Sequence, residues 1–528
     1  MCGELHGYRE SLLRQNTWVL EEKFTLGKTV EVRYKVVLRG VPNVIDFLRS
    51  ENIIARSALR LSSGVLTLSP PSRFLTFLPL RMQIKTLLSE YLKRNRGVLL
   101  FLACFVFLLS FYANCSYFFN TPKQLAFFPP FVEELNLNYN KHLGAEYYFI
   151  AQALAAGKGF SNPFQVDTGP TAWMPPLYPF LLALLITLFH STLAVACIIV
   201  FLKNVVLVSA GMVIYGIAQR TARTLNASWA VAVYIVLLLN DFRSFFQITH
   251  DTWLVVLFIT TIFPLAVYLR KHGSTLTTAL IWGCVGGLSM LASPVVGAVW
   301  CALWLAVLVK KKNVRMQFAS LSVCLVLFSP WIIRNYAVFD KFIVMKSNLF
   351  FDAYFVNYEL GKDGLIDGPA FLEKHPVWQA QEDPEAPYRK QGEARFLETY
   401  KQKFFDALER DPYTYLRNIK NRLLAALFIY YPLDDCARAL VGRSIIHALP
   451  FMGFLIILFF KGYRGSEYMK IAMVTCVLYL IPYIAVNYYV RYAIPLTPLK
   501  VLFVFWGTDL LVTRRHPLLP KHSSPVIP

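Results

Sequence analysis

Long stretches with almost no charge are the feature that most restricts how this chain can fold. A helix that crosses a bilayer needs ~20 mostly apolar residues, and a tilted or packed one can be shorter. The stretches are too long and alternate too little for barrel strands, so we expect helices, which satisfy their own backbone polar groups in lipid. Such runs occur at about 97–118, 193–217, 226–240, 252–269, 275–291, 295–309, 316–333, 445–460, 468–486 and 492–511.

The composition agrees with a membrane protein. Hydrophobic residues make up 56% of the 528 residues and charged residues only 16%, whereas a soluble domain carries ~25% charged residues. The net charge of +21 suits basic cytoplasmic loops beside anionic lipid rather than nucleic-acid binding, which needs a recognisable basic soluble domain. Most of the nine cysteines lie in apolar runs without CxxC spacing, so we expect them to pack rather than to form disulfides or bind metal.

Basic residues near the ends of the apolar runs predict the orientation. If all six basic clusters are cytoplasmic, ten crossings alternate correctly and both termini lie inside. Leu177–Phe189 and Leu423–Tyr431 are then interfacial or re-entrant; if they also cross, the number rises toward twelve. We therefore expect an all-α polytopic membrane protein with about 10–12 transmembrane helices. The clusters are Lys93/Arg94/Arg96, Arg220/Arg223, Arg270/Lys271, Lys310/Lys311/Lys312/Arg315, Lys461/Arg464 and Arg514/Arg515.

This topology divides the chain into five segments. The acidic residues between Asp340 and Asp411, together with helical periodicity, predict a small external helical domain in the one long external loop. The N-terminal extension has no span and no signal-peptide pattern, so a true start at Met82 is an alternative to a small cytoplasmic domain. The segments are an extension (1–81), an N-terminal transmembrane module (82–333) with its first external loop (119–176), an external loop domain (334–444), C-terminal transmembrane helices (445–511) and a cytoplasmic tail (512–528).

The first external loop places a single carboxylate at the start of a short helix. Glu146 opens a stretch with helical periodicity, and Gly157 and Gly159 are suited to end it because glycine accepts the left-handed conformation. Pro175-Pro176 then blocks helix before the next apolar run. We expect Glu146 to lie at the boundary between water and lipid.

The motifs along the chain resemble those of the GT-C superfamily of membrane glycosyltransferases, close to glycosyltransferase family 39. That family includes the protein O-mannosyltransferases and, more distantly, the aminoarabinose transferase of lipid A. The resemblance covers about 97–511 and implies a GT-C-type helix bundle with surface helices in the first external loop. The motifs that carry it are "E…IA..L..G.GFS.PF…GPTAW.PPLYP" (146–179), "GCVGGLSMLASP" (283–294), "PWIIRNYAVFDKFIVMKSN" (330–348), "HP" (375–376), "GE" (392–393) and "RYAIPLTP" (491–498).

The resemblance also implies a function. It is the transfer of a sugar from a polyprenyl-phosphate donor to an acceptor at the external face of a bacterial inner membrane. In that superfamily an acidic residue of the first external loop acts on the acceptor; here it is Glu146, although aspartate is more usual. A second acidic residue often lies where this chain has Asp251. The acceptor, whether glycan, lipid or protein, and the sugar are left open.

The chemistry needs a general base for the acceptor hydroxyl and cations for the leaving phosphate. Glu146 and Asp251 are the catalytic candidates. The candidates for the donor phosphate are Arg334, Arg491, Lys203 and Lys346, and the other candidates are Asp167, His250, His375 and Glu393. Arg422 is a further cation at the same face. No metal is required, although some relatives use a divalent cation and Glu146 with Asp167 or Asp251 could hold one.

Each candidate has a structural alternative. The two catalytic carboxylates could cap helices, Asp167 could shape a turn, and the arginines could anchor at the interface. The rival functions are a transporter or flippase of a lipid-linked precursor and a non-catalytic scaffold. A transporter tends to show repeated halves with polar residues at the membrane midplane, and we find no internal repeat.

Overall fold

The chain falls into two compact units, Met1–Arg96 and Gly97–Pro528. In the first unit, β1 (Arg60–Ser62) and β2 (Val65–Thr67) pair antiparallel. Met82, the alternative start, lies outside the described residues. The computed structural model describes residues 60–62, 65–67, 89–120, 145–247, 250–311, 314–360, 363–365, 374–430, 437–460 and 466–515.

Within the described residues, seven helices are long and apolar enough to cross a membrane. This confirms the prediction of an all-α polytopic membrane protein at the level of helix type and hydropathy. The last span, Val490–Arg514, joins the short helix α20 (Val490–Ala493) to α21. The full helices are α4 (Arg96–Asn120), α7 (Thr192–Thr221), α9 (Thr252–His272), α12 (Val314–Phe339), α18 (Ala437–Phe459), α19 (Glu467–Ala485) and α21 (Thr497–Arg515).

Four further apolar helices are shorter: α6 (Leu177–Phe189), α8 (Ser228–Asn240), α10 (Leu276–Ala292) and α11 (Pro294–Lys311). A 13-residue helix such as α6 is ~20 Å long, less than the ~30 Å hydrocarbon core. The predicted spans 226–240, 275–291 and 295–309 correspond to three of these short helices. The second short apolar stretch, Leu423–Tyr431, corresponds to the last turn of the amphipathic helix α17 (Pro412–Leu427) and the residues after it.

The glycine-rich motif of α10 allows close helix packing. A Cβ at Gly286 would collide with the ring of Trp300 in α11, and one at Gly283 with the carbonyl oxygen of Ser320 in α12. Small residues let membrane helices approach closely. The motif "GCVGGLSMLASP" therefore has a structural role, holding α10 against its two neighbours.

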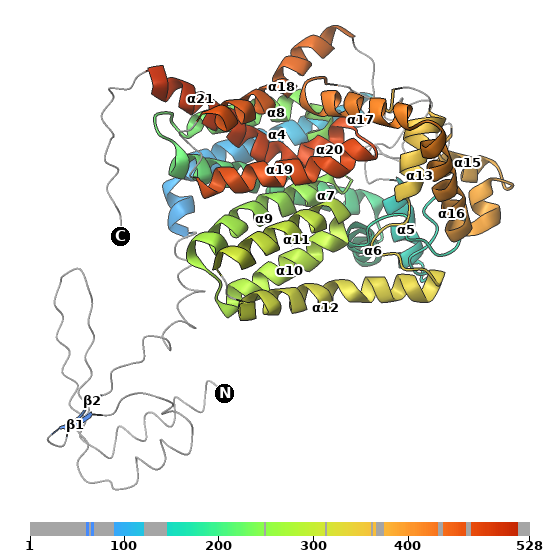
Figure 1. Cartoon of the computed structure of the whole chain (residues 1–528), viewed down its shortest axis with the longest axis horizontal. Coiled ribbons are helices and arrows are strands. Elements are labelled where there is room, and N and C mark those ends of the chain that lie inside the picture. Colours follow the sequence, from blue (N-terminus) through green and yellow to red (C-terminus); the bar gives the residue numbers. More distant parts are fainter. Residues whose placement is uncertain are drawn as a thin grey trace. The chain divides into compact units, whose positions relative to one another are not determined.

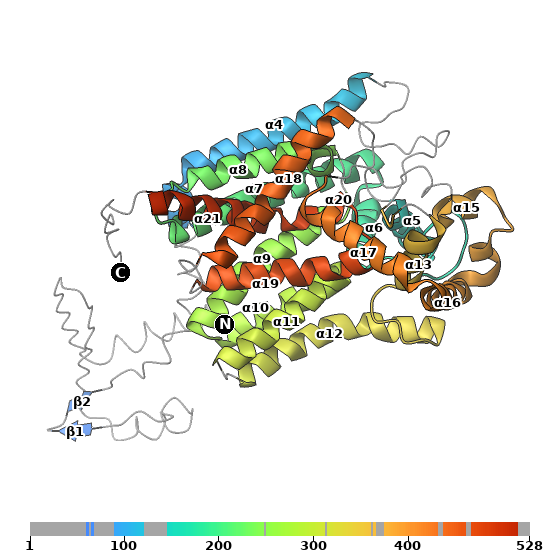
Figure 2. The same ribbon diagram turned by 45° about the horizontal axis from the view of Figure 1, so that its top comes forward.

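The predicted external segment and the first loop gather at one end of the second unit. Figures 1 and 2 both show α5 (Ala145–Ala155), α13 (Leu349–Tyr354), α15 (Pro376–Glu382) and α16 (Pro387–Arg410) together, far from the C-terminal end of α21.

The basic end of α21 meets other predicted cytoplasmic clusters. Asp509 of α21 accepts hydrogen bonds from the backbone N–H groups of Arg223, Thr224 and Leu225, and Arg514 lies over the ring of Phe460. Arg223 and Arg514, which belong to two of the predicted cytoplasmic clusters, are thus brought near the same end of the bundle.

Candidate active site

A cavity of about 900 Å³ lies among α5, α10, α11, α13, α19 and α20. Its volume falls within the ~300–1,000 Å³ typical of small-molecule sites. One part of the wall is apolar and includes Met290, Val295, Ala298, Cys301, Phe328 and Met345. The other part is polar and includes Tyr147, His250, Asp251, Lys346, Asp352, Asn487, Arg491 and Tyr492.

Asp251 lies at the centre of a chain of hydrogen bonds in the polar part. Its Oδ2 accepts a bond of 2.8 Å from the hydroxyl of Tyr147, and its Oδ1 lies 3.2 Å from Nδ1 of His250. The Nη1 of Arg491 lies 3.4 Å from Nε2 of the same imidazole. Asp251 stands directly before α9, yet its side chain makes no capping hydrogen bond. The carboxylate therefore faces the cavity instead of closing the helix end.

The charges of this chain follow from burial and from these partners. Burial lowers the pKa of His250, the bond to Asp251 opposes that effect, and the charge of Arg491 lowers it further. The Nδ1 of His250 also lies 2.9 Å from the hydroxyl of Thr252. A neutral imidazole can share its Nδ1 proton between this hydroxyl and Asp251 and accept at Nε2 from Arg491. For Asp251 burial raises the pKa, but the hydrogen bonds from His250 and Tyr147 and the charge of Arg491 outweigh it and leave the pKa lowered. Asp251 is thus an ionised carboxylate at neutral pH.

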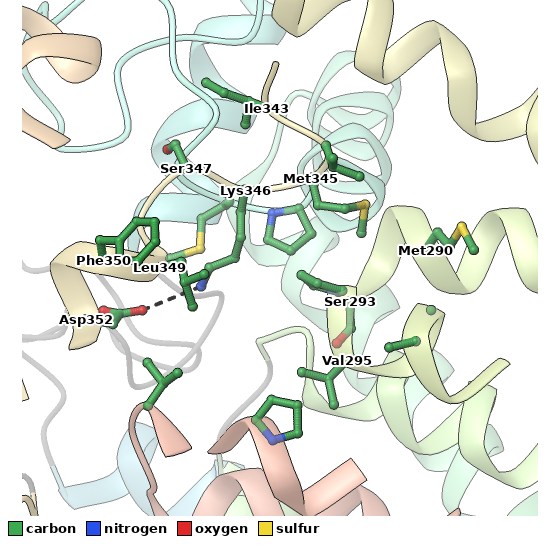
Figure 3. A pocket seen from close by; sticks show the side chains of 18 of the residues that line it. Met290, Ser293, Val295, Ile343, Met345, Lys346, Ser347, Leu349, Phe350 and Asp352 are labelled. Carbon is green, nitrogen blue, oxygen red and sulfur yellow. Dashed lines mark ion pairs between the residues drawn. The ribbon is translucent and has the colours of Figure 1, made fainter. Parts of the chain in front are cut away.

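Lys346 brings a second cation to the cavity. Its Nζ lies 3.8 Å from Oδ2 of Asp352 in α13, and Figure 3 shows this pair opposite Met290, Ser293 and Val295. Lys346 belongs to the stretch 340–348 between α12 and α13, which runs along one wall of the cavity.

Backbone groups of the 340–348 stretch hold it in place. Trp331 donates from Nε1 to the carbonyl oxygen of Met345 over 2.9 Å, and Asn335 donates to that of Ile343 over 3.0 Å. The N–H of Ser347 donates to the carbonyl oxygen of Ala172 over 2.9 Å. The motif at 330–348, one of those that resemble the GT-C superfamily, therefore positions Lys346 through Trp331 and Asn335.

Glu146 is buried and does not line the cavity. It is the second residue of α5, is only 4% exposed, and its Oε2 has no hydrogen-bond partner in the described part of the chain. Burial raises its pKa to about 7, while its own backbone N–H and the charges of Arg491 and Lys346 oppose the rise. The charges of Arg491 and Lys346 act on Glu146, but it is not among the residues that line the cavity.

The stability of the fold should fall as Glu146 ionises. The pKa in the fold, about 7, is above the ordinary value of 4.5, so stabilisation by the protonated form is complete below pH 4.5 and lost as pH rises through about 7. The shift corresponds to an order of 3 kcal/mol. We expect Glu146→Gln and the wild type to have similar melting temperatures at pH 4.5. As pH rises toward 8, the melting temperature of the variant should exceed that of the wild type by an increasing amount, measured by thermal unfolding in detergent. A difference in melting temperature that stays constant across this range would contradict the prediction.

Glu393 touches the cavity but acts as a clamp. It accepts a hydrogen bond from the hydroxyl of Thr171 and one of 2.7 Å from the backbone N–H of Ala172, both in the first loop. The hydroxyls of Ser347 and Tyr388 each donate a further bond of 2.7 Å to it. Gly392 before it has φ of 71°, a left-handed conformation that glycine adopts without strain. The "GE" motif thus bends α16 and ties the first loop to the 340–348 stretch.

Arg334, a predicted phosphate-binding residue, and Arg422, the further cation at the same face, both have structural roles. Arg334 donates to the carbonyl oxygens of Thr171 over 2.7 Å and Phe160 over 2.8 Å. Arg422 is buried and donates to the carbonyl oxygens of Ile484 and Ala485 over 2.7 and 2.8 Å. Neither lines the cavity that contains Arg491.

Three more predicted site residues lie elsewhere. Lys203 is buried and donates to the carbonyl oxygen of Phe246 over 3.1 Å. His375 is enclosed by the rings of Trp173 and Phe351, and burial lowers its pKa to about 3. Asp167 is exposed on the first loop. Searched over the described residues, the chain shows no group of three or more His, Cys, Asp or Glu side chains placed to hold a metal ion.

Sequence reasoning missed Tyr147 and Asp352. Tyr147 is adjacent to Glu146, and the helical pattern that begins there does not indicate its hydrogen bond to Asp251. Asp352 stands among large apolar residues in "LFFDAY" (349–354), a setting in which an acidic side chain needs a cationic partner. That setting was the available signal for a buried ion pair.

Comparisons with protein-family models, with curated proteins and with solved structures found no match.

Proposed function

We propose that this protein is a membrane glycosyltransferase that moves a sugar from a polyprenyl-phosphate donor to an acceptor hydroxyl. One observation carries the proposal: ionised Asp251, the cations Arg491 and Lys346, and an apolar wall all line one cavity. A lipid phosphate needs cations and an apolar surface, and the acceptor needs a base. The cavity provides these three requirements side by side.

The reaction assigns a task to each group. Asp251 takes the proton of the acceptor hydroxyl, and the hydroxyl oxygen forms a bond to the anomeric carbon. The bond between that carbon and the phosphate oxygen breaks, and its electron pair leaves with the lipid phosphate. Arg491 and Lys346 neutralise the charge that develops there. The bonds from His250 and Tyr147 hold the Asp251 carboxylate in position.

The apolar wall is suited to the isoprenoid chain. It runs along α11 from Pro294 to Cys301, a rise of ~10 Å at 1.5 Å per residue. This length accommodates about two isoprene units beside the polar part. The basic clusters near the opposite end of the bundle favour an external position for the cavity, at the outer face of a bacterial inner membrane.

Cleavage of the donor tests the proposal. The purified protein in nanodiscs is incubated with a panel of polyprenyl-phosphate sugars and a membrane extract as the source of acceptor, and released polyprenyl phosphate is measured by mass spectrometry. We expect release with at least one donor and a decrease of about a hundredfold for Lys346→Gln, because one charge-stabilising group is lost. Lys390→Gln is the matched control, since Lys390 is exposed and pairs with Glu385 outside the cavity.

The same donors, placed in sealed proteoliposomes, separate the rival function. Movement of intact donor across the bilayer with no release of polyprenyl phosphate would support a transporter of lipid-linked precursors. Equal release by both lysine variants would contradict the assignment of the cavity.

A further inference from the structure

A second hollow, of about 570 Å³, lies between α6 and α12. We call it the α6–α12 groove. Leu291 of α10 lines its floor, Leu177 and Phe180 line one wall, and Leu327 and Val338 belong to the other.

The groove opens on the surface that meets lipid. Phe180 and Leu184 are exposed on α6, and Ile333 and Val338 are exposed on α12. Because α12 is long and apolar enough to cross the membrane, these exposed apolar side chains are suited to contact with acyl chains. A lipid molecule can therefore enter the groove sideways from the bilayer.

Two basic residues, Arg334 and Lys158, line the groove, and no carboxylate from the described part of the chain lines it. Within the described residues, neither Arg334 nor Lys158 forms an ion pair, and the groove lining contains no acidic residue. The guanidinium carbon of Arg334 lies 5.2 Å from the ring centre of Trp331 and 5.5 Å from that of Phe160. The guanidinium of Arg334 also donates to Oδ1 of Asn335, and the charge of Glu393, which lies outside the groove lining, acts on it. Lys158 and Arg334 are thus the charged residues of an otherwise uncharged lining, which an anion would complement.

The turn that carries Lys158 is shaped to present it. Gly157 and Gly159 on either side have φ of 75° and 74°, so the chain turns tightly here and Lys158 is exposed at the tip. The hydroxyl of Ser161 donates to the carbonyl oxygen of Lys158 over 3.1 Å and fixes the turn.

We propose that the α6–α12 groove binds an anionic phospholipid of the surrounding leaflet. Its phosphate lies between Lys158 and Arg334, and an acyl chain lies along Leu177, Phe180 and Leu327. The occupant is a resident membrane lipid rather than the polyprenyl-phosphate donor, because no carboxylate in this groove can serve as a base. The inference is independent of the transfer reaction proposed above.

Binding there would support the cavity from outside. Arg334 also donates to the carbonyl oxygens of Phe160 and Thr171, and Thr171 donates to Glu393, which lines the cavity. A phosphate on Arg334 would therefore hold the first loop in the arrangement that the cavity needs.

Lipid retention tests the inference. The protein is exchanged into detergent with equal phosphatidylglycerol and phosphatidylcholine of the same acyl chains, and bound lipid is measured by native mass spectrometry. We expect preferential retention of phosphatidylglycerol, weakened more than about fivefold by Lys158→Glu, because loss of one basic residue near an anionic headgroup contributes about that factor and the added negative charge acts in the same direction. Val338→Trp fills the groove and should lower retention of both lipids. Val326→Trp is the matched control, since Val326 is 71% exposed on α12 and does not line the groove.

The outcomes are decisive either way. Equal retention of the two lipids, or equal retention by wild type and Lys158→Glu, would overturn the inference. Displacement of phosphatidylglycerol by polyprenyl phosphate at equal concentration would assign the groove to the donor and overturn it as well. Since retention is measured without acceptor or sugar transfer, failure here is distinguishable from failure of the glycosyltransferase proposal.

Discussion

Asp251→Asn is expected to lower the rate of sugar transfer by ~10²–10⁴-fold, the usual contribution of a general base. Asparagine keeps the size of the side chain but cannot accept the proton of the acceptor hydroxyl. The measurement is kcat for donor cleavage in the presence of acceptor, together with binding of the donor, which we expect to change little. Asp167→Asn is the matched control because Asp167 is exposed on the first loop and outside the cavity.

The result also ranks the two predicted carboxylates. Glu146 does not line the cavity, so Glu146→Gln should retain more activity than Asp251→Asn. The reverse order would mean that Glu146 reaches the acceptor during the reaction, and near-normal transfer by Asp251→Asn would remove the proposed base.

Arg491→Gln is expected to lower kcat by ~10²–10³-fold, the effect of losing one group that stabilises developing charge. A second consequence concerns the pH profile. The charge of Arg491 lowers the pKa of Asp251, so its removal raises that pKa, and the acid limb of the rate profile should move to higher pH. Arg491→Lys keeps the charge but loses the planar fork that binds phosphate through two bonds. It should keep the acid limb in place and recover only part of the rate.

The comparison of the two Arg491 variants separates catalysis from packing. Arg491 lies against the rings of Tyr489 and Tyr492, at 5.0 and 5.2 Å from their centres, so either substitution disturbs this contact. A loss of rate that is equal in both variants, with the acid limb unmoved, would indicate a packing role and contradict binding of the donor phosphate. The dependence of kcat on pH, measured with saturating donor, decides between a catalytic role and a packing role.

Local features of the structure followed closely from the sequence. Apolar runs predicted the long helices, and the stretch that begins at Glu146 is the helix α5, ended by Gly157 as expected. The chain is interrupted between α10 and α11 at Ser293-Pro294, the last two residues of the motif GCVGGLSMLASP. Helix formation depends on hydropathy, periodicity and end signals within a few turns, and the sequence records all of these.

The site was predictable only in part. Glu146, Asp251, Arg491 and Lys346 were named from the sequence, and the structure brings three of them to the cavity and Glu146 behind it. Glu146 and Asp251 were equivalent as acidic residues at the start of helices. Burial raises the pKa of Glu146, whereas the partners of Asp251 lower its pKa. Those environments come from segments distant in the sequence.

The sequence by itself determined that this chain is a bundle of apolar helices with basic and polar ends, because both properties are local. Only the tertiary structure decided that Arg491, not Arg334, shares a cavity with Asp251, and that Asp352 accompanies Lys346. Both arginines lie in candidate spans beside aromatic rings, and nothing in their neighbours along the chain distinguishes them. The distinction arises from how helices far apart in sequence pack, because that packing places Arg491 in the lining of the cavity with Asp251 and Arg334 in that of the α6–α12 groove.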